Sequence, residues 1–121
     1  MYKLSTRKTG SIGETIAANY LQKRGYKILT QNWMCRYGEL DLVTLHNKKV
    51  VFVEVKYVTN SLYCNAVELF SYKKQRHLSR TVQIFIQKYP KINDIWQLDL
   101  ICLTQSKEKL YIEHYENILT F

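Results

Sequence analysis

Three residues near the middle of the chain, Asp41, Glu54 and Lys56, have the types and spacing for hydrolytic chemistry on a phosphate ester. Two neighbouring carboxylates can bind Mg²⁺ or Mn²⁺, because hard divalent cations take one or two carboxylates and complete their coordination with water and phosphate oxygens. A lysine beside such a cation could position or deprotonate a water molecule, or stabilise a pentavalent phosphate. Whether the three side chains meet depends on the elements that carry them.

The carboxylates lie in a predicted β-hairpin. Two strand-like segments, ELDLVTL and VVFVEVKY, flank the four polar residues 46–49, which suit a hairpin connection. Pairing outward from this connection sets Asp41 opposite Glu54 and Glu39 opposite Lys56. All four side chains then lie on one face, since residues two apart on a strand share a face. Directly opposed Cβ atoms are about 4.5–5.5 Å apart, so like charges placed there are destabilising.

Two interpretations of this charged cluster stay open. The second strand is apolar on both faces, as an interior strand is, so carboxylates near its end are partly desolvated and need a cation. A divalent metal would meet that need. A surface ladder, in which Lys56 forms crossed ion pairs with Glu39 and Asp41, would explain the same charges without chemistry. We expect Glu39 to be a partner of Lys56 rather than a metal ligand.

The remaining periodicities place this hairpin in an α/β fold. A first helix begins at Ser11, where Ser at the N-cap and Glu14 at N3 fit a capping box, and stops at Gly25. The predicted order is a helix, three strands, a helix and two strands, which indicates a mixed sheet flanked by helices. After the first helix, the predicted elements cover residues 26–33, 39–45, 50–57, 67–89, 96–103 and 110–115. We expect a single domain over residues 1–121, in which residues 1–10 form a flexible basic arm.

The charge balance favours a polyanionic partner or an anionic membrane surface, because 18 Lys and Arg against 10 Asp and Glu give a net charge of +8. On the second helix, Lys73, Arg76, His77 and Arg80 share one face. Lys74 lies instead on the sheet side near the helix start, where it could reach a phosphate. A basic stripe is also typical of a solvated surface, but beside a candidate metal site we favour binding to a nucleic-acid backbone.

Cysteine usage and hydropathy predict a cytoplasmic protein. The three cysteines form no C-x-x-C pair, which argues against zinc and favours reduced thiols. The N-terminus has no apolar signal-peptide core. The longest apolar run, VVFVEV, is far shorter than the roughly 20 residues of a membrane helix. We therefore expect no membrane partner. The sequence permits a homodimer without predicting one.

The hairpin motifs resemble those of a known bacterial family. GELDLV at 38–43 and VFVEVK at 51–56 look like the G-E-[IL]-D-[LI] and [VF]-V-E-V-K motifs of the YraN-like family. This uncharacterised family is placed among predicted endonucleases distantly related to archaeal Holliday-junction resolvases. The similarity covers most of residues 11–103. It includes Gly13-Glu14, Ala17-Ala18, Tyr20-Leu21, the segment 25–29, Asn32, Lys74-Gln75-Arg76 and Asp99.

The resemblance implies a restriction-endonuclease-like fold with an αβββαβ core. It also implies a PD-(D/E)-x-K-type site made of Asp41, Glu54 and Lys56, with Glu14 as an extra acidic ligand. Mg²⁺ or Mn²⁺ would then be bound by Asp41, Glu54 and Glu14. From the residues alone, Glu14 has a second role open to it, since as N3 of a capping box it would accept the Ser11 backbone N–H.

The sequence therefore predicts a metal-dependent nuclease that hydrolyses DNA phosphodiester bonds, in structured or branched DNA by family analogy. Two positions depart from the family. Val58 stands where a basic residue is usual, and Gln97-Leu98 where Arg-Phe is usual, so both changes remove contacts that could hold a phosphate. They leave open a non-catalytic nucleic-acid-binding module with the same fold. A protein-interaction domain whose charges only solubilise it is the third alternative.

Overall fold

The elements follow the predicted order along the chain. The computed structural model describes residues 2–58, 71–91 and 95–119, with side chains from Ile12 onward. The order αβββαβ predicted for a restriction-endonuclease-like core is confirmed, and a further strand follows it. Residues 67–70 of the predicted second helix lie outside the described residues. The elements are α1 (Tyr2–Lys23), β1 (Lys27–Cys35), β2 (Gly38–His46), β3 (Lys49–Val58), α3 (Tyr72–Lys88), β4 (Trp96–Ser106) and β5 (Lys109–Tyr115).

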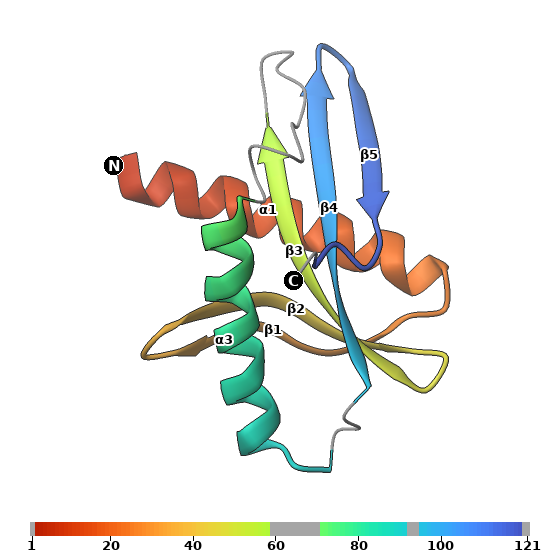
Figure 1. The fold of residues 1–121 in the computed structure, drawn as a ribbon. Coiled ribbons are helices and arrows are strands. Elements are labelled where there is room, and N and C mark those ends of the chain that lie inside the picture. Colours follow the sequence, from red (N-terminus) through yellow and green to blue (C-terminus); the bar gives the residue numbers. More distant parts are fainter. Residues whose placement is uncertain (1, 59–70, 92–94, 120–121) are drawn as a thin grey trace.

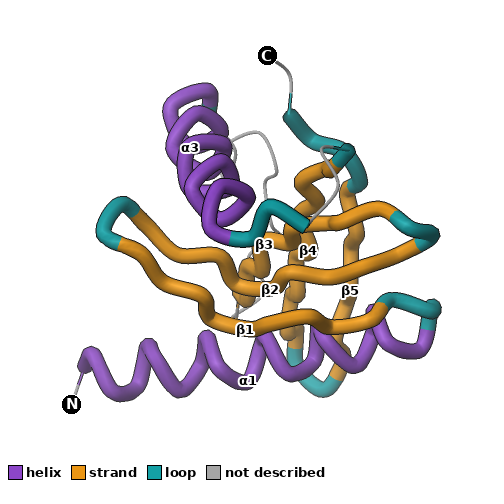
Figure 2. The backbone as a smooth tube through the Cα atoms, turned by 90° about the horizontal axis from the view of Figure 1, so that it is seen from below, coloured by secondary structure: helices purple, strands orange, loops and turns teal. Residues whose placement is uncertain are grey.

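The strands form one mixed sheet in the order β1-β2-β3-β4-β5. Neighbours pair antiparallel except β3 and β4, which run parallel, because the chain between them crosses over through α3. Figures 1 and 2 show α1 across one face of the sheet and α3 on the other. Each helix covers its own apolar core: Phe52 packs in the core on the α3 side and Val53 in the core on the α1 side. β3 is therefore an interior strand, as its apolar run predicted.

The β2–β3 hairpin has the predicted register, with Leu45 paired to Val50. Its predicted connection over 46–49 is wrong, because the strands stay paired up to a turn of two residues. Asn47 and Lys48 form this turn at φ values of 51° and 66°. Positive φ at both positions is the type I′ geometry, whose twist matches the right-handed twist of the strands.

Helix α1 begins at Tyr2, so the predicted basic arm over 1–10 and the predicted N-cap at Ser11 are wrong. Gly13 consequently lies inside a helix, where glycine costs about 1 kcal/mol relative to alanine. A Cβ at this position would lie 3.0 Å from the Cβ of Tyr57. Glycine therefore allows α1 to approach β3 closely, which a larger residue would prevent.

The other predicted helix signals are mostly confirmed. Gly25 follows α1 at a φ of 88°, the left-handed conformation expected of a residue that ends a helix. Helix α3 ends at Lys88, shortly before Pro90. Helical spacing predicts an apolar stripe of Leu78, Val82, Phe85, Ile86 and Tyr89 on α3. Leu78, Val82 and Phe85 are buried, and Ile86 packs beside them. Tyr89 was expected in this stripe, but it follows the helix and is exposed.

Candidate metal-binding active site

Asp41 lies where β2 turns away from β3. The paired positions of the two strands reach Leu42 and Val53, and beyond them Oδ2 of Asp41 accepts a hydrogen bond of 2.9 Å from the Val55 N–H. Strand alternation also breaks here, because Leu40 and Leu42, two residues apart, pack in cores on opposite faces of the sheet. Asp41 is only 8% exposed. A buried carboxylate of this kind needs charged or hydrogen-bonding partners to remain ionised.

Glu54 interacts with Asp41, as the hairpin geometry predicted. The pKa of Glu54 is raised far above its usual range, chiefly by burial and then by a hydrogen bond with Asp41 and by the charge of Asp41. Lys74 opposes this shift, because its Nζ lies 3.5 Å from Oε2 of Glu54. Without metal, the Glu54 carboxyl therefore retains its proton to higher pH than an isolated side chain would.

Glu14 on α1 lies close to Asp41 and to Glu39 of the same strand. Its pKa is raised to about 7, first by burial, then by the charge of Asp41 and to a smaller extent by that of Glu39, while a hydrogen bond with Asn32 lowers it. Glu14 is in the interior of α1, so its alternative role in a capping box is wrong. Oε1 of Glu14 is buried and has no hydrogen-bond partner among the residues that the structure describes. An unsatisfied buried acceptor costs about 1–3 kcal/mol.

Three of these carboxylates converge closely enough to share one cation. Glu14, Glu39 and Asp41 each offer an oxygen, and these oxygens all lie within 4.8 Å of one another. An all-oxygen, all-carboxylate donor set fits Mg²⁺ or Mn²⁺. The unsatisfied Oε1 of Glu14 is consistent with the same fit. The predicted ligands Asp41 and Glu14 belong to this group, whereas Glu54 is joined to it through Asp41.

Glu39 is a candidate metal ligand for which the sequence predicted a different role. It was expected to be a partner of Lys56, yet its carboxylate lies among those of Glu14 and Asp41. The spacing of Glu39 and Asp41, two residues apart on one strand, did indicate that their side chains lie close together. What the sequence did not reveal is that α1 brings Glu14 to the same place.

The two predicted lysines lie differently: Lys74 contacts a carboxylate of the site, whereas Lys56 is placed only by its position two residues after Glu54 on β3. Lys74 was predicted to lie on the sheet side of the second helix, and its contact with Glu54 confirms this. Lys56, predicted as the catalytic lysine, is exposed on β3. Both are therefore available to a phosphate, one from the helix and one from the strand.

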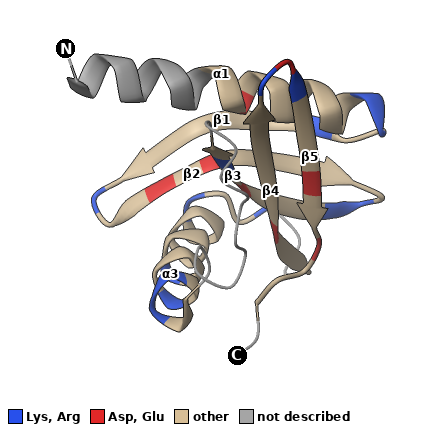
Figure 3. Cartoon of the chain, turned by 90° about the horizontal axis from the view of Figure 1, so that it is seen from above, with Lys and Arg blue, Asp and Glu red and all other residues tan. Residues whose placement is uncertain are grey.

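The other predicted nucleic-acid contacts, Lys73, Arg76 and Arg80, are exposed on α3. They line a hollow of about 760 Å³ together with Ser71, Tyr72, Lys74 and His77. In Figure 3, basic positions mark both α3 and the tip of the β1–β2 hairpin, on the same side of the molecule. The hairpin tip packs closely against α3. Gly38 at the tip allows this, because a Cβ there would lie 2.7 Å from Oγ1 of Thr81 on α3.

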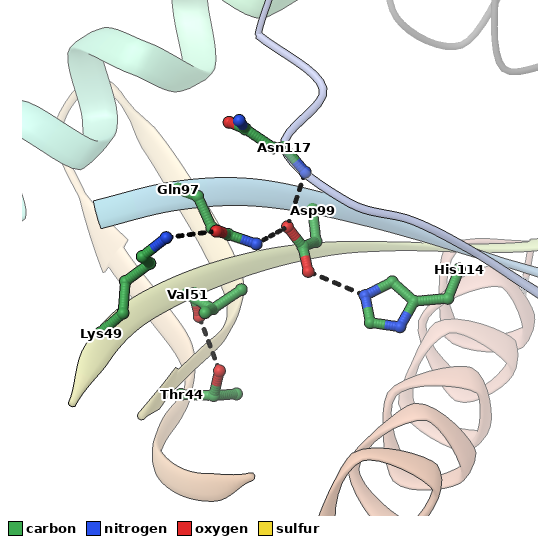
Figure 4. Close-up of polar contacts among 7 residues, drawn as sticks. All are labelled: Thr44, Lys49, Val51, Gln97, Asp99, His114 and Asn117. Carbon is green, nitrogen blue, oxygen red and sulfur yellow. Dashed lines mark hydrogen bonds and ion pairs between the residues drawn. The ribbon is translucent and has the colours of Figure 1, made fainter. Parts of the chain in front are cut away.

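A second polar cluster surrounds Asp99, a fully buried residue of β4 (Figure 4). Oδ1 of Asp99 accepts hydrogen bonds from Nε2 of Gln97 at 2.9 Å and from the Asn117 N–H at 3.0 Å. Oδ2 lies 2.8 Å from Nε2 of His114. The spacing of the histidines along the chain predicts no role for His114, because only the pairing of β5 with β4 brings it to Asp99.

The two departures from the family pattern lie away from the carboxylates. Gln97 donates to Asp99 and accepts a hydrogen bond from Lys49, so it belongs to the second cluster. It lies three residues before Leu100, the β4 partner of Glu54, or about 10 Å along the strand. Val58 packs against the core on the α3 side. The change at Gln97 therefore alters the Asp99 cluster rather than the carboxylate site.

The fold and the site define an α/β protein in which carboxylates from a helix and a hairpin converge. Residues 13–103 match the Uncharacterised protein family UPF0102. The chain is 37% identical to a UPF0102 protein of Caldanaerobacter subterraneus over 98% of both chains. It is 36% identical to a UPF0102 protein of Vibrio parahaemolyticus over 84% of this chain and 85% of that one. The chain therefore belongs to the UPF0102 family, which confirms the YraN-like resemblance.

Among solved structures, the chain is similar to Pyrococcus furiosus SfsA in complex with Ca²⁺. The TM-score is 0.41 and the sequence identity is 16%, and the match covers 96% of this chain and 65% of that one. In the described part of the chain, no helix is both long enough and apolar enough to cross a membrane.

Proposed function

We propose that this protein is a metal-dependent nuclease that hydrolyses DNA phosphodiester bonds. The observation that carries the proposal is the convergence of Glu14, Glu39 and Asp41, whose oxygens lie within 4.8 Å of one another, while no described residue offers a hydrogen bond to the buried Oε1 of Glu14. Like charges held this closely are unfavourable in themselves. A divalent cation would reverse their effect and satisfy the unpaired oxygen.

Mg²⁺ or Mn²⁺ would be held by Glu14, Glu39 and Asp41, with Glu54 beside them. When bound, such an ion supplies a Lewis acid and lowers the pKa of a coordinated water. Asp41 has the central role among the protein groups. It interacts with Glu54, and its carboxylate also lies within 4.8 Å of those of Glu14 and Glu39. Its hydrogen bond from the Val55 N–H fixes the orientation of the carboxylate, so the ligands are held in place before substrate binds.

The lysines would act on the phosphate. Lys74, 3.5 Å from Glu54, would exchange part of its ion pair for a contact with a non-bridging oxygen. Lys56 is exposed on β3 and would position or deprotonate the attacking water, or stabilise the charge of the pentavalent phosphate. A protonated lysine cannot bind the metal itself, so Lys56 would affect turnover without affecting metal affinity.

The test is cleavage of single-stranded, duplex, flap and junction DNA with Mg²⁺ or Mn²⁺. We expect the wild type to cleave at least one of them, and Asp41→Asn and Lys56→Ala each to lower the rate by about 10² or more. Glu108→Gln, an exposed carboxylate in the β4–β5 turn, is the matched control and should retain activity. Metal stabilisation of the fold should survive Lys56→Ala and disappear in Asp41→Asn.

The exposed basic face of α3, formed by Lys73, Arg76 and Arg80, favours a second candidate, a nucleic-acid-binding module with the same fold and without turnover. This candidate predicts binding whose affinity falls linearly on a log–log plot against salt, because phosphate contacts release counterions. If the wild type binds DNA in this way and cleaves none of the four substrates with either metal, the nuclease proposal is rejected in favour of this module.

A further inference from the structure

The tip of the β1–β2 hairpin presents an aromatic ring beside the basic face of α3. Tyr37 is 44% exposed, although its ring would be more favourably buried in a core. The guanidinium carbon of Arg80 lies 4.4 Å from the centre of this ring, and that of Arg36 lies 5.9 Å from it. One exposed ring is thus accompanied by two guanidinium groups, one from α3 and one from the same turn.

The backbone next to this ring packs closely against α3. At Gly38, the residue after Tyr37, a Cβ would lie 2.7 Å from Oγ1 of Thr81 and 3.1 Å from Nε2 of His77. The hairpin tip therefore rests directly on α3, and a side chain at Gly38 would push it away. A ring held on a fixed backbone loses little conformational entropy when a ligand binds.

The ring also lies within reach of the carboxylate site. Lys74, which contacts Glu54, and Arg80, which contacts Tyr37, are six residues apart on α3. At about 1.5 Å per residue, they are separated by about 9 Å along the helix axis. This distance is less than three stacked nucleotides at about 3.4 Å each. The basic side chains between the two points can follow a phosphate backbone over this length.

We propose that Tyr37 is a stacking platform for an unpaired base of the nucleic acid, with Arg80 and Arg36 beside it. Bases of single strands stack on aromatic rings and on guanidinium planes, whereas the faces of bases inside a duplex are already covered. The preferred substrate would then carry an unpaired base within a few nucleotides of the scissile phosphate. This inference rests on the proposed function, because it assigns a substrate feature to the same site.

The test compares strands that differ only in their bases. Fluorescence anisotropy in EDTA measures binding of a 20-nucleotide oligo-dT and of an abasic strand of equal length and charge. Stacking of one base on an aromatic ring contributes about 1–3 kcal/mol, so the wild type should prefer oligo-dT by about 5-fold or more. Tyr37→Ala should reduce this preference towards unity and leave binding of the abasic strand unchanged. Tyr37→Phe should preserve the preference.

Tyr111→Ala is the matched control. Tyr111 is similarly exposed, at 46%, but belongs to β5 at the opposite edge of the sheet from β1. Equal binding of the two strands by the wild type, or a preference that Tyr37→Ala leaves intact, would overturn the inference. The DNA-cleavage assay tests the proposed function separately. A protein that discriminates bases but never cleaves supports the stacking role and rejects the nuclease, whereas one that cleaves without discriminating bases rejects the stacking role alone.

Discussion

The carboxylate clusters around Asp41 and Asp99, whose central residues are both buried, differ in how well their oxygens are satisfied. In the cluster around Asp99, both carboxylate oxygens have partners, contributed by Gln97, Asn117 and His114. In the cluster around Asp41, carboxylate oxygens lie near other carboxylate oxygens, and within the described part of the chain one oxygen of Glu14 is buried without a hydrogen-bond partner. The first arrangement stabilises the fold as it stands. The second brings like charges together and leaves a buried acceptor unsatisfied, an arrangement that is more typical of a binding site than of a structural cluster.

The same difference appears in the groups that each cluster connects. Asp99 joins β4 to β5 and to the segment after β5, so its hydrogen bonds hold together neighbouring parts of the sheet. The Asp41 cluster joins α1 to the β2–β3 hairpin through groups that repel one another. Stability and function are therefore separable by mutation. Removing a carboxylate should destabilise the protein at Asp99 and should not do so at Asp41 or Glu14.

The largest effect on stability is expected for Asp99→Ala. The substitution leaves the Gln97 side chain, the Asn117 N–H and His114 without their shared acceptor, and we expect the free energy of unfolding to fall by about 3 kcal/mol. Urea unfolding of the wild type and variants in EDTA measures this difference. Glu14→Gln is the matched change in the other cluster and should be neutral or stabilising at pH 8. Equal destabilisation by both changes would remove the distinction between the clusters.

The pH dependence of the free energy of unfolding should further distinguish the Asp41 cluster from the Asp99 cluster. A carboxyl whose folded-state pKa is raised to about 7, as for Glu14, binds its proton more tightly in the folded state than in the unfolded state. Its stabilising contribution is complete below the unfolded pKa near 4.5 and is lost as the pH rises through about 7. In EDTA, the protein should therefore lose stability between pH 5 and pH 8. Glu14→Gln should flatten this slope, and saturating Mn²⁺ should do the same for the wild type. A slope unchanged by Glu14→Gln would contradict the raised pKa.

The hairpin that carries Asp41 and Glu54 could be predicted from the sequence because its determinants are local. Alternation, the polar turn and the interior apolar run fix the register, and a one-residue slip would move every apolar side chain to the wrong face. The start of α1 could not be predicted in this way. The Ser11–Glu14 pattern fits a capping box, but the helix continues through it, and Gly13 is required by the contact with Tyr57 rather than by a helix end.

The positions of Glu39, His114 and Tyr37 could not be predicted because each depends on an element that is distant in sequence. Glu39 is a candidate ligand because α1 places Glu14 beside it. His114 lies close to Asp99 because β5 pairs with β4. The Arg80 guanidinium lies over the Tyr37 ring because α3 packs against the hairpin tip. Spacing along the chain contains no signal for contacts of this kind.

The central claim is that Asp41 belongs to a group of carboxylates that repel one another without metal and bind a divalent cation together. The most direct measurement is thermal unfolding of the wild type and Asp41→Asn, each in EDTA and in Mn²⁺. In EDTA at pH 8, Asp41→Asn should be more stable by about 0.5–1 kcal/mol, because it removes one charge at nearly constant shape.

Mn²⁺ should stabilise the wild type by RT ln(1 + [L]/Kd), since it would bind only the folded state, and should leave Asp41→Asn unchanged. If Asp41 instead serves only to pair with a lysine, losing its charge should destabilise the protein. A destabilised Asp41→Asn, together with a wild type that does not respond to Mn²⁺, would contradict the account.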